Sequence, residues 1–320
     1  MIFDKRTERI VLAIFFLVAL CIPLFLEENS FFVGKVTTIL ILIVFVMSLD
    51  FLVGRVGLVT LGHALFYGLG GYLFAILAPE YEAVNFWMYA MYIMGICALI
   101  ALVVGAVVLR TSGIYFIMIT LAISQMAYYF FFDSLEFGGG DGLFIFMKPE
   151  TSIFGLSFLD LDNPTHFYYL ALLAVLITLM VIKIILRSRF GRIVEASRLN
   201  PERTEALGYN IFAFRLISYV IGSMLAAYAG LLFALQYGYV NPQFMTWEMS
   251  GTALVMSILG GMGTIYGAIL GVITYEGLEY LFEHFTEEWL LFMGGAIILM
   301  VLMLRKGLAG YLEKLLEKKP

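Results

Sequence analysis

The 320-residue sequence is 62% hydrophobic and only 13% charged, with a formal net charge of −5. A soluble domain holds about 45–50% apolar and about 25% charged residues, so this composition excludes an ordinary soluble protein. Apolar runs near the roughly 20 residues of a membrane-spanning helix recur along the chain. These runs are continuous rather than alternating, which argues against a β-barrel. We therefore predict an all-α, polytopic transmembrane helical bundle that forms one domain over residues 1–320.

Ten apolar segments follow one another and predict about eight to ten spans. The first follows a basic start and resembles a signal sequence, but no A-x-A cleavage site follows, so we interpret it as an uncleaved span. The eighth is too short to cross as a straight helix and ends in LGGMGT (259–264), which predicts a half-helix or a broken one. The segments are 10–26, 36–53, 57–78, 85–109, 112–132, 167–186, 214–238, 249–260, 265–282 and 289–304.

The distribution of Lys and Arg predicts the orientation in the membrane. With a cytoplasmic N-terminus, nearly all basic residues lie inside, and only Lys35 and Lys148 lie outside. We expect a multi-pass protein of the cell inner membrane, with both termini cytoplasmic. Two long loops remain, an extracytoplasmic one at 133–166 and a cytoplasmic one at 187–213. Partners are expected to bind through these loops, because loops carry much of a protein's binding function.

The cytoplasmic loop contains the pattern of a short capped helix. Asn200 suits the N-cap, Pro201 suits the first helical position, and Gly208 suits the C-terminal end. The pattern predicts a helix over 201–207, preceded by a second helical piece over 191–199. A solvated connector between two spans is the alternative, although such a linker does not need this much order.

Six glycines crowd residues 54–71, namely Gly54, Gly57, Gly62, Gly68, Gly70 and Gly71. Each costs about 1 kcal/mol relative to Ala inside a helix, so we predict a kinked or interrupted helix. An interrupted helix exposes backbone groups that can hold a substrate's carboxylate and ammonium. His63 either lines the pore, with Thr60 near it, or is hydrogen-bonded inside the bundle, which is the commoner role.

Small residues recur at four-residue spacing in two segments, Gly222-Ala226-Gly230 and Gly263-Gly267-Gly271. Such faces let helices approach closely, either as plain packing or as a contact that slides during transport.

Three ionisable residues lie inside apolar runs, where a charge costs at least about 2.5 kcal/mol. For Asp50 we favour an ion pair with Arg55. Glu276 and Glu279 share a helix face with Glu283, and they either line an outer vestibule or cap a helix contact.

Several motifs together carry a resemblance to a known family. SLDFLVGRVGLVTLGHALFYGLGGY (48–72), RTSGIYFIMITLAISQM (110–126), GGGDGL (138–143) and GYVNPQFMTWEMSGTALVMSILGGMGTIYGAILG (238–271) occur in order. With the loop at 191–208, they resemble the M-type permeases of branched-chain amino acid ABC importers. The resemblance covers about residues 36 to 305. It implies an importer for branched-chain or related small amino acids, driven by ATP hydrolysis on separate subunits with alternating access.

The resemblance also implies the partners. These are two cytoplasmic ABC ATPase subunits, a sister permease in a heterodimer (with a homodimer as the alternative), and an extracytoplasmic substrate-binding protein. The sequence has no G-x-x-x-x-G-K-[ST] motif, so ATP and Mg²⁺ are expected on the ATPases. We expect no cofactor, no metal, no nucleic acid and no enzymatic activity in this chain.

The resemblance further implies a coupling helix that docks in a groove of an ATPase. Glu195-Ala196-Ser197 only loosely echoes the Glu-Ala-Ala signature of ABC importers, so the assignment rests on the whole of 191–208. The expected coupling residues are Glu195, Arg198, Asn200, Pro201, Glu202, Arg203, Ala206, Leu207 and Gly208. The expected translocation-path residues are Thr60, Gly62, His63, Gly260, Gly261, Gly263, Glu276 and Glu279.

Three alternatives remain at this stage. Related permeases carry urea or short amides, and the sequence does not separate these substrates from amino acids. An ion-coupled secondary transporter needs paired intramembrane acids and an internal repeat, neither of which is evident. A purely structural membrane protein does not explain the interrupted glycine-rich spans.

Overall fold

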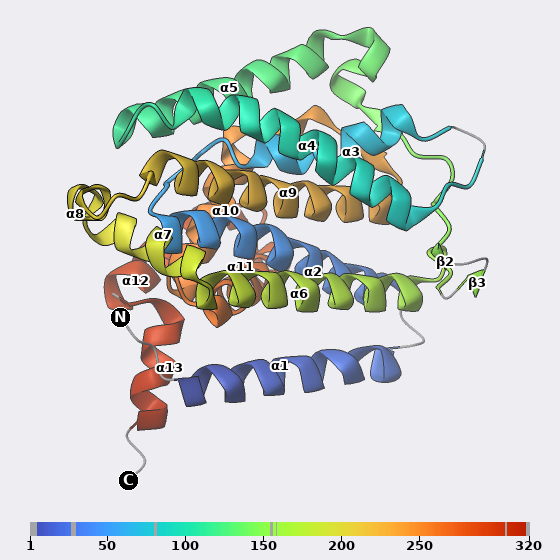
Figure 1. Cartoon of the computed structure of the whole chain (residues 1–320). Helices are drawn as coiled ribbons and strands as arrows, with labels where there is room; N and C mark the ends of the chain where they lie inside the picture. Colours follow the sequence, from blue (N-terminus) through green and yellow to red (C-terminus); the bar gives the residue numbers. More distant parts are fainter. Residues whose placement is uncertain are drawn as a thin grey trace.

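The computed structural model describes residues 5–26, 30–79, 82–153, 156–157, 159–304 and 306–317. Within this part of the chain the fold is an all-α bundle with four very short strands, as predicted (Figure 1). The helices are α1 (Lys5–Leu26), α2 (Ser30–Asp50), π-helical η1 (Phe51–Val56), α3 (Ala64–Leu77), α4 (Phe86–Val108), α5 (Ile114–Asp133), η2 (Leu135–Phe137), η3 (Gly139–Asp141), α6 (Pro164–Arg187), α7 (Arg189–Leu199), α8 (Pro201–Ala206), α9 (Ile211–Tyr237), η4 (Pro242–Met245), α10 (Trp247–Gly260), α11 (Ile265–Phe285), α12 (Trp289–Met303) and α13 (Gly307–Glu317).

Fewer membrane-crossing helices are found than the eight to ten predicted. Among the described residues, five are long and apolar enough to span, or up to seven if each bent pair is one span. The five are α2 with η1, α4, α5, α6 and α9. The count falls because α3 is short and because α10 and α11 pair into one broken span. The first apolar segment forms α1, which this count does not include.

The long helices run side by side and define two ends of the bundle (Figure 1). The helices α7 and α8, the start of α1 and all of α13 lie at one end, which we call the α7–α8 end. The loop between α5 and α6 lies at the other, which we call the β2–β3 end. This loop carries β1 (Leu143–Phe144), β2 (Ser152–Ile153) and β3 (Leu156–Ser157). Antiparallel pairing of β2 with β3, and of β1 with β4 (Tyr239–Val240), ties the loop to itself and to the end of α9.

The core is built around α2, whose residues from Leu40 to Asp50 are all buried. This explains its continuously apolar sequence, because a helix that is surrounded on all sides needs no polar face. Helices α3 and α9 cross closely beside it. A side chain at Gly70 would overlap the backbone of Ala227, and one at Gly230 would overlap the backbone of Tyr67. Part of the small-residue pattern on α9 therefore serves close packing.

Two helices are interrupted where the glycines predicted it. After η1 the chain is non-helical from Gly57 until α3 begins at Ala64. The second interruption separates α10 from α11 at residues 261–264, and the two helices meet at an angle of 112°. The predicted half-helix at 249–260 is therefore confirmed as α10.

Candidate functional site

The loop at 187–213 folds into two consecutive capped helices. Ser188 Oγ accepts a hydrogen bond from Gly191 N at 3.2 Å and caps α7. Asn200 Oδ1 accepts from Arg203 N at 2.9 Å and caps α8, with Pro201 at its first position. Each cap satisfies a backbone N–H that has no partner inside its own helix. The predicted pair of helices is confirmed; α8 ends at Ala206, and Gly208 just beyond it has a φ of +87°.

The inner face of α7 is fixed to the membrane bundle. Gly191, Val194 and Ser197 are buried. The Arg198 guanidinium donates a hydrogen bond to the backbone carbonyl of Gly54 in η1. The Glu195 carboxylate lies 3.5 Å from Arg55, also in η1. These two charged side chains reach the same short π-helix and link α7 to η1.

The outer face of α7 and α8 is open. Leu199 and Leu207 are 81% and 72% exposed, although both are apolar. A hollow of about 570 Å³ lies on this surface, lined by Arg189, Arg192, Ile193, Ala196, Thr204, Leu207 and Tyr209. The other expected coupling residues of α8, namely Pro201, Glu202, Arg203 and Ala206, are exposed beside it. This surface, which we call the α7–α8 face, combines apolar and charged groups, as protein–protein interfaces do.

Beneath η1 the backbone of Gly54 lies against the backbone of Gly263, in the break between α10 and α11. A side chain on Gly54 would overlap Gly263, and one built on Gly263 would lie 2.9 Å from the Gly54 carbonyl oxygen. Only glycine permits this approach from both sides. The close contact places the carbonyl that Arg198 binds directly against the break.

The Asp50 side chain stabilises the same contact between Gly54 and Gly263. Its Oδ1 accepts hydrogen bonds from Ser257 Oγ at 2.6 Å and from Gly263 N at 2.8 Å. The predicted ion pair between Asp50 and Arg55 is wrong, because Arg55 pairs with Glu195 instead. Asp50 lies at the end of α2, where Ser257 of α10 and the backbone N–H of Gly263 supply its donors. We call Asp50, Gly54, Arg198, Ser257 and Gly263 the junction.

Three of the expected path residues lie in the interruption between η1 and α3. Thr60 is buried, and its hydroxyl accepts from Gly62 N at 3.1 Å. Gly62 lies against the backbone of Thr120 in α5. His63 is 1% exposed, and its Nε2 is 2.7 Å from Ser48 Oγ. Ser48 Oγ also donates to Phe45 O at 2.6 Å, so Ser48 ties the His63 ring to α2 whichever ring tautomer is present. The His63 ring is thus hydrogen-bonded inside the bundle.

The other expected path residues separate into two groups. Gly260 ends α10, and Gly261 and Gly263 lie in the break before α11, with Gly263 against Gly54 of η1. Glu276 and Glu279 are half-buried on the far half of α11, about 20 Å along that helix from the break at 1.5 Å per residue. The structure therefore brings the glycines to the junction and leaves the two glutamates near the β2–β3 end.

Small polar residues inside apolar segments were missed by the sequence reasoning. Ser48 holds His63, Ser257 holds Asp50, and Ser250 Oγ accepts from Ala64 N at 2.9 Å, which joins the start of α3 to α10. A signal existed, since each is an isolated hydroxyl in an apolar run, and such a group needs a partner in lipid. Within the described residues, no group of three or more His, Cys, Asp and Glu side chains could hold a metal ion.

Long apolar helices, a π-helix that lies against the break between α10 and α11, and an exposed pair of helices outside the bundle are features of an integral membrane protein with interrupted spans. The chain belongs to the family described as "Branched-chain amino acid transport system / permease component", whose model matches residues 31–302. It is therefore a permease component of a transport system, not an enzyme.

Curated relatives agree with this family. The chain is 29% identical to the high-affinity branched-chain amino acid transport system permease protein LivM of Escherichia coli, over 94% of this chain and 75% of that protein. It is 34% identical to the corresponding BraD of Pseudomonas aeruginosa over 39% of this chain and 41% of that protein. It is 29% identical to the autoinducer 2 import system permease protein LsrC of Escherichia coli, over 46% and 45%. No solved structure matches.

Proposed function

We propose that this chain is the translocation subunit of an ABC importer for branched-chain or related small amino acids. ATP hydrolysis on two separate ATPase subunits would switch it between outward and inward access. The observation that carries the proposal is the bond from Arg198 of α7 to Gly54, whose backbone lies against Gly263 in the α10–α11 break. A displacement of α7 has a direct route to an interrupted membrane span.

Transmission of this displacement needs ordered helices, and N-caps stabilise the starts of these helices. Ser188 and Asn200 hold the starts of α7 and α8, and Asn210 Oδ1 accepts from Ala213 N at 3.2 Å to begin α9. An ATPase that holds the α7–α8 face would therefore move both helices as a unit. Glu195 and Arg198 carry that motion to η1, and Glu202, Arg203, Ala206 and Leu207 meet the ATPase. ATP and Mg²⁺ would be bound by the ATPases.

The basic residues support a cytoplasmic α7–α8 end, with both termini on that side. The loop at 133–166 then faces outward and meets a soluble binding protein. A sister permease would complete the pathway as a heterodimer, with a homodimer as the alternative. Thr60, Gly62 and His63, together with the glycines of the α10–α11 break, would lie along or beside the path. Glu276 and Glu279 would lie at its outer end.

The substrate class rests on the family description and on the similarity to LivM. The similarity to an autoinducer 2 import permease shows that related permeases serve another small solute. Urea or short amides, which the family resemblance also allows, stay the alternative substrate class. The match to the permease family over residues 31–302 favours ATP coupling over an ion-coupled secondary transporter.

The test is a pull-down of the tagged chain from detergent-solubilised native membranes, with the bound proteins identified by mass spectrometry. We expect ATPase subunits and a second permease, and the accompanying binding protein narrows the substrate. A chain recovered alone, in a detergent that preserves known complexes, would return α7 and α8 to the role of a connector.

A further inference from the structure

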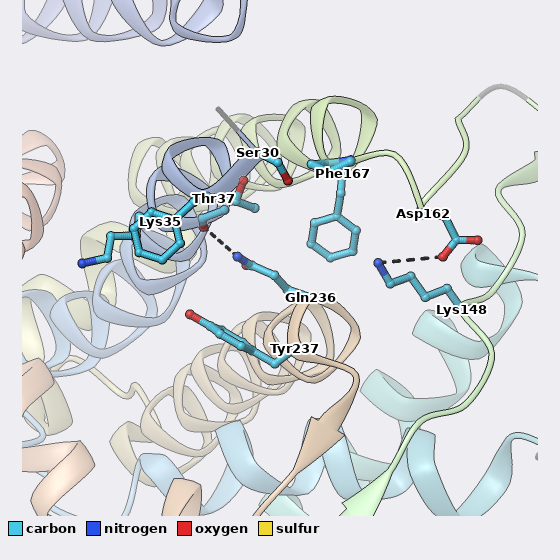
Figure 2. Close-up of a pocket in the computed structure, with 11 residues that line it drawn as sticks. Ser30, Lys35, Thr37, Lys148, Asp162, Phe167, Gln236 and Tyr237 are labelled. Atoms are coloured by element: carbon cyan, nitrogen blue, oxygen red, sulfur yellow. Dashed lines mark hydrogen bonds and ion pairs between the residues drawn. The ribbon is translucent and has the colours of Figure 1, made fainter. Parts of the chain in front are cut away.

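The two lysines that the sequence places outside the membrane line the same cavity. Lys35 comes from α2 and Lys148 from the loop before α6, 113 positions later. The cavity measures about 350 Å³ and lies at the β2–β3 end between α2, α6 and α9 (Figure 2). This volume falls in the range of small-molecule sites, which is about 300–1,000 Å³. The two ammonium groups face different ways: Lys35 Nζ lies 4.7 Å from the centre of the Tyr280 ring, so Lys148 rather than Lys35 can meet a ligand in the cavity.

Lys148 is positioned with unused hydrogen-bonding capacity. Its Nζ donates to Leu161 O at 3.0 Å and lies 5.6 Å from the centre of the Phe167 ring. The Asp162 carboxylate is 3.9 Å away, beyond hydrogen-bonding distance. An ammonium group has three N–H donors, so Lys148 can bind another anion. The carboxylate of Asp162 is 80% exposed and can likewise bind another cation.

The rest of the cavity is shaped by aromatic and fixed polar groups. Phe167 and Phe31 form apolar walls. Gln236 Nε2 donates to Gly34 O at 2.7 Å and to Thr38 Oγ1 at 3.0 Å. Because a carbonyl can only accept, these bonds fix the orientation of the amide. Its oxygen is buried and, among the described residues, has no hydrogen-bond partner. One wall of the cavity therefore holds an acceptor that lacks a donor.

We propose that this cavity binds a small zwitterionic α-amino acid with an apolar side chain. The ligand carboxylate binds Lys148 Nζ, its ammonium binds Asp162, and its side chain lies against Phe167. In an α-amino acid the carboxylate and the ammonium are attached to the same carbon atom, so the two charges lie close together. This spacing suits the charged atoms of Lys148 and Asp162, which are 3.9 Å apart. The inference rests on the proposed function for the amino acid class. It adds a site on the permease itself, separate from the junction and from any binding protein.

The experiment uses the intact importer complex in nanodiscs of phosphatidylglycerol, without the binding protein. Equilibrium binding of radiolabelled leucine is measured. We expect saturable binding, weakened about tenfold or more by either Lys148→Met or Asp162→Asn, since each removes a charge-assisted partner. The matched control is Lys35→Met. The Lys35 ammonium points away from Lys148 in Figure 2 and lies 4.7 Å from the centre of the Tyr280 ring. The leucine affinity of the Lys35→Met variant should therefore stay within about twofold of wild type.

Two further measurements test whether a variant has simply failed to fold and whether the ligand is a lipid head group. Lys148→Met also loses the bond to Leu161 O, so Asp162→Asn, which leaves that bond intact, decides the case if Lys148→Met fails to assemble. A parallel set of discs contains phosphatidylethanolamine, whose head group is also a zwitterion. Abolition of leucine binding by this lipid would assign the cavity to a head group and overturn the proposal.

Two outcomes distinguish this inference from the proposed function. Absence of leucine binding in a complex that still imports leucine with ATP, when it is reconstituted in proteoliposomes with its binding protein, would overturn the cavity assignment and leave the importer intact. Leucine binding that depends on Lys148 and Asp162, in a complex whose ATP hydrolysis drives no uptake in those proteoliposomes, would support the cavity and count against the importer. Equal weakening by Lys35→Met would also overturn the cavity assignment.

Discussion

Asp50 Oδ1 accepts the backbone N–H of Gly263 at 2.8 Å, across 213 positions of sequence. This one hydrogen bond joins the end of α2 to the break between α10 and α11. Ser257 Oγ donates to the same oxygen from the last turn of α10. A buried carboxylate thus holds the interrupted span against η1, where Arg198 of α7 also binds.

Removal of the Asp50 carboxylate should destabilise the fold. Asp50→Leu leaves the Ser257 hydroxyl and the Gly263 N–H buried without their acceptor, at a cost of about 2–3 kcal/mol. Asp50→Asn keeps an oxygen at this place and should cost less. The measurement is the midpoint of thermal unfolding in detergent, with the exposed Asp141→Ala as control. An unchanged midpoint in Asp50→Leu would contradict the role of Asp50 in the junction.

Substitution of Gly54 tests the close contact of the two backbones. In Gly54→Ala the new methyl group overlaps Gly263, so we expect loss of most uptake and a lower unfolding midpoint. Gly251→Ala is the matched control within α10, where a methyl group meets open space. Alanine is favoured over glycine in a helix by up to about 1 kcal/mol, so this control should be neutral or stabilising. Two variants with the same phenotype would show that the contact is not special.

Charge changes on the exposed side of α8 should uncouple the two activities. Glu202→Lys reverses an exposed charge and Ala206→Asp introduces one, and neither side chain is buried. We expect ATP hydrolysis to lose its link to uptake, while expression and membrane insertion stay normal. Glu287→Lys makes the same charge change at an exposed residue between α11 and α12, outside both the α7–α8 face and the 133–166 loop, and serves as the control. Normal uptake in both α8 variants would contradict the assignment of α8 to coupling with the ATPase.

Accessibility of residue 63 decides between its two roles. In a background without Cys21 and Cys97, His63→Cys should react slowly with a water-soluble thiol reagent, because the side chain is 1% exposed. Leu207→Cys, 72% exposed, should react quickly and reports the maximum rate. Fast modification of residue 63, protected by substrate, would instead support a pore-lining position.

Features that depend on local sequence were predicted well. The caps at Asn200, the end near Gly208 and the interruption in 54–71 follow from residues that control nearby backbone geometry. The half-helix ending at Gly260 follows in the same way. These predictions held because glycine, proline and capping side chains act within about one helical turn.

Features that depend on distant partners were predicted poorly. Arg55 was expected to pair with Asp50, five positions away, but it pairs with Glu195, 140 positions away. The bend of 112° between α10 and α11 was also not predicted, because apolar composition shows that a segment is buried without showing how steeply it crosses or where it bends. Nothing in the sequence showed that Lys35 and Lys148 share a cavity.

The sequence by itself determined that this protein is a helical membrane protein, because the transfer of apolar helices into lipid depends mainly on composition and length. Its motifs carried the resemblance to a permease family. It also determined where those helices break, through the local geometry of glycine. Only the tertiary structure decided which broken segments touch, that Arg198 binds η1, and that Asp50 holds Gly263. The reason is physical: a buried polar group must find a partner, and packing of the whole chain decides which donors and acceptors lie within about 3 Å.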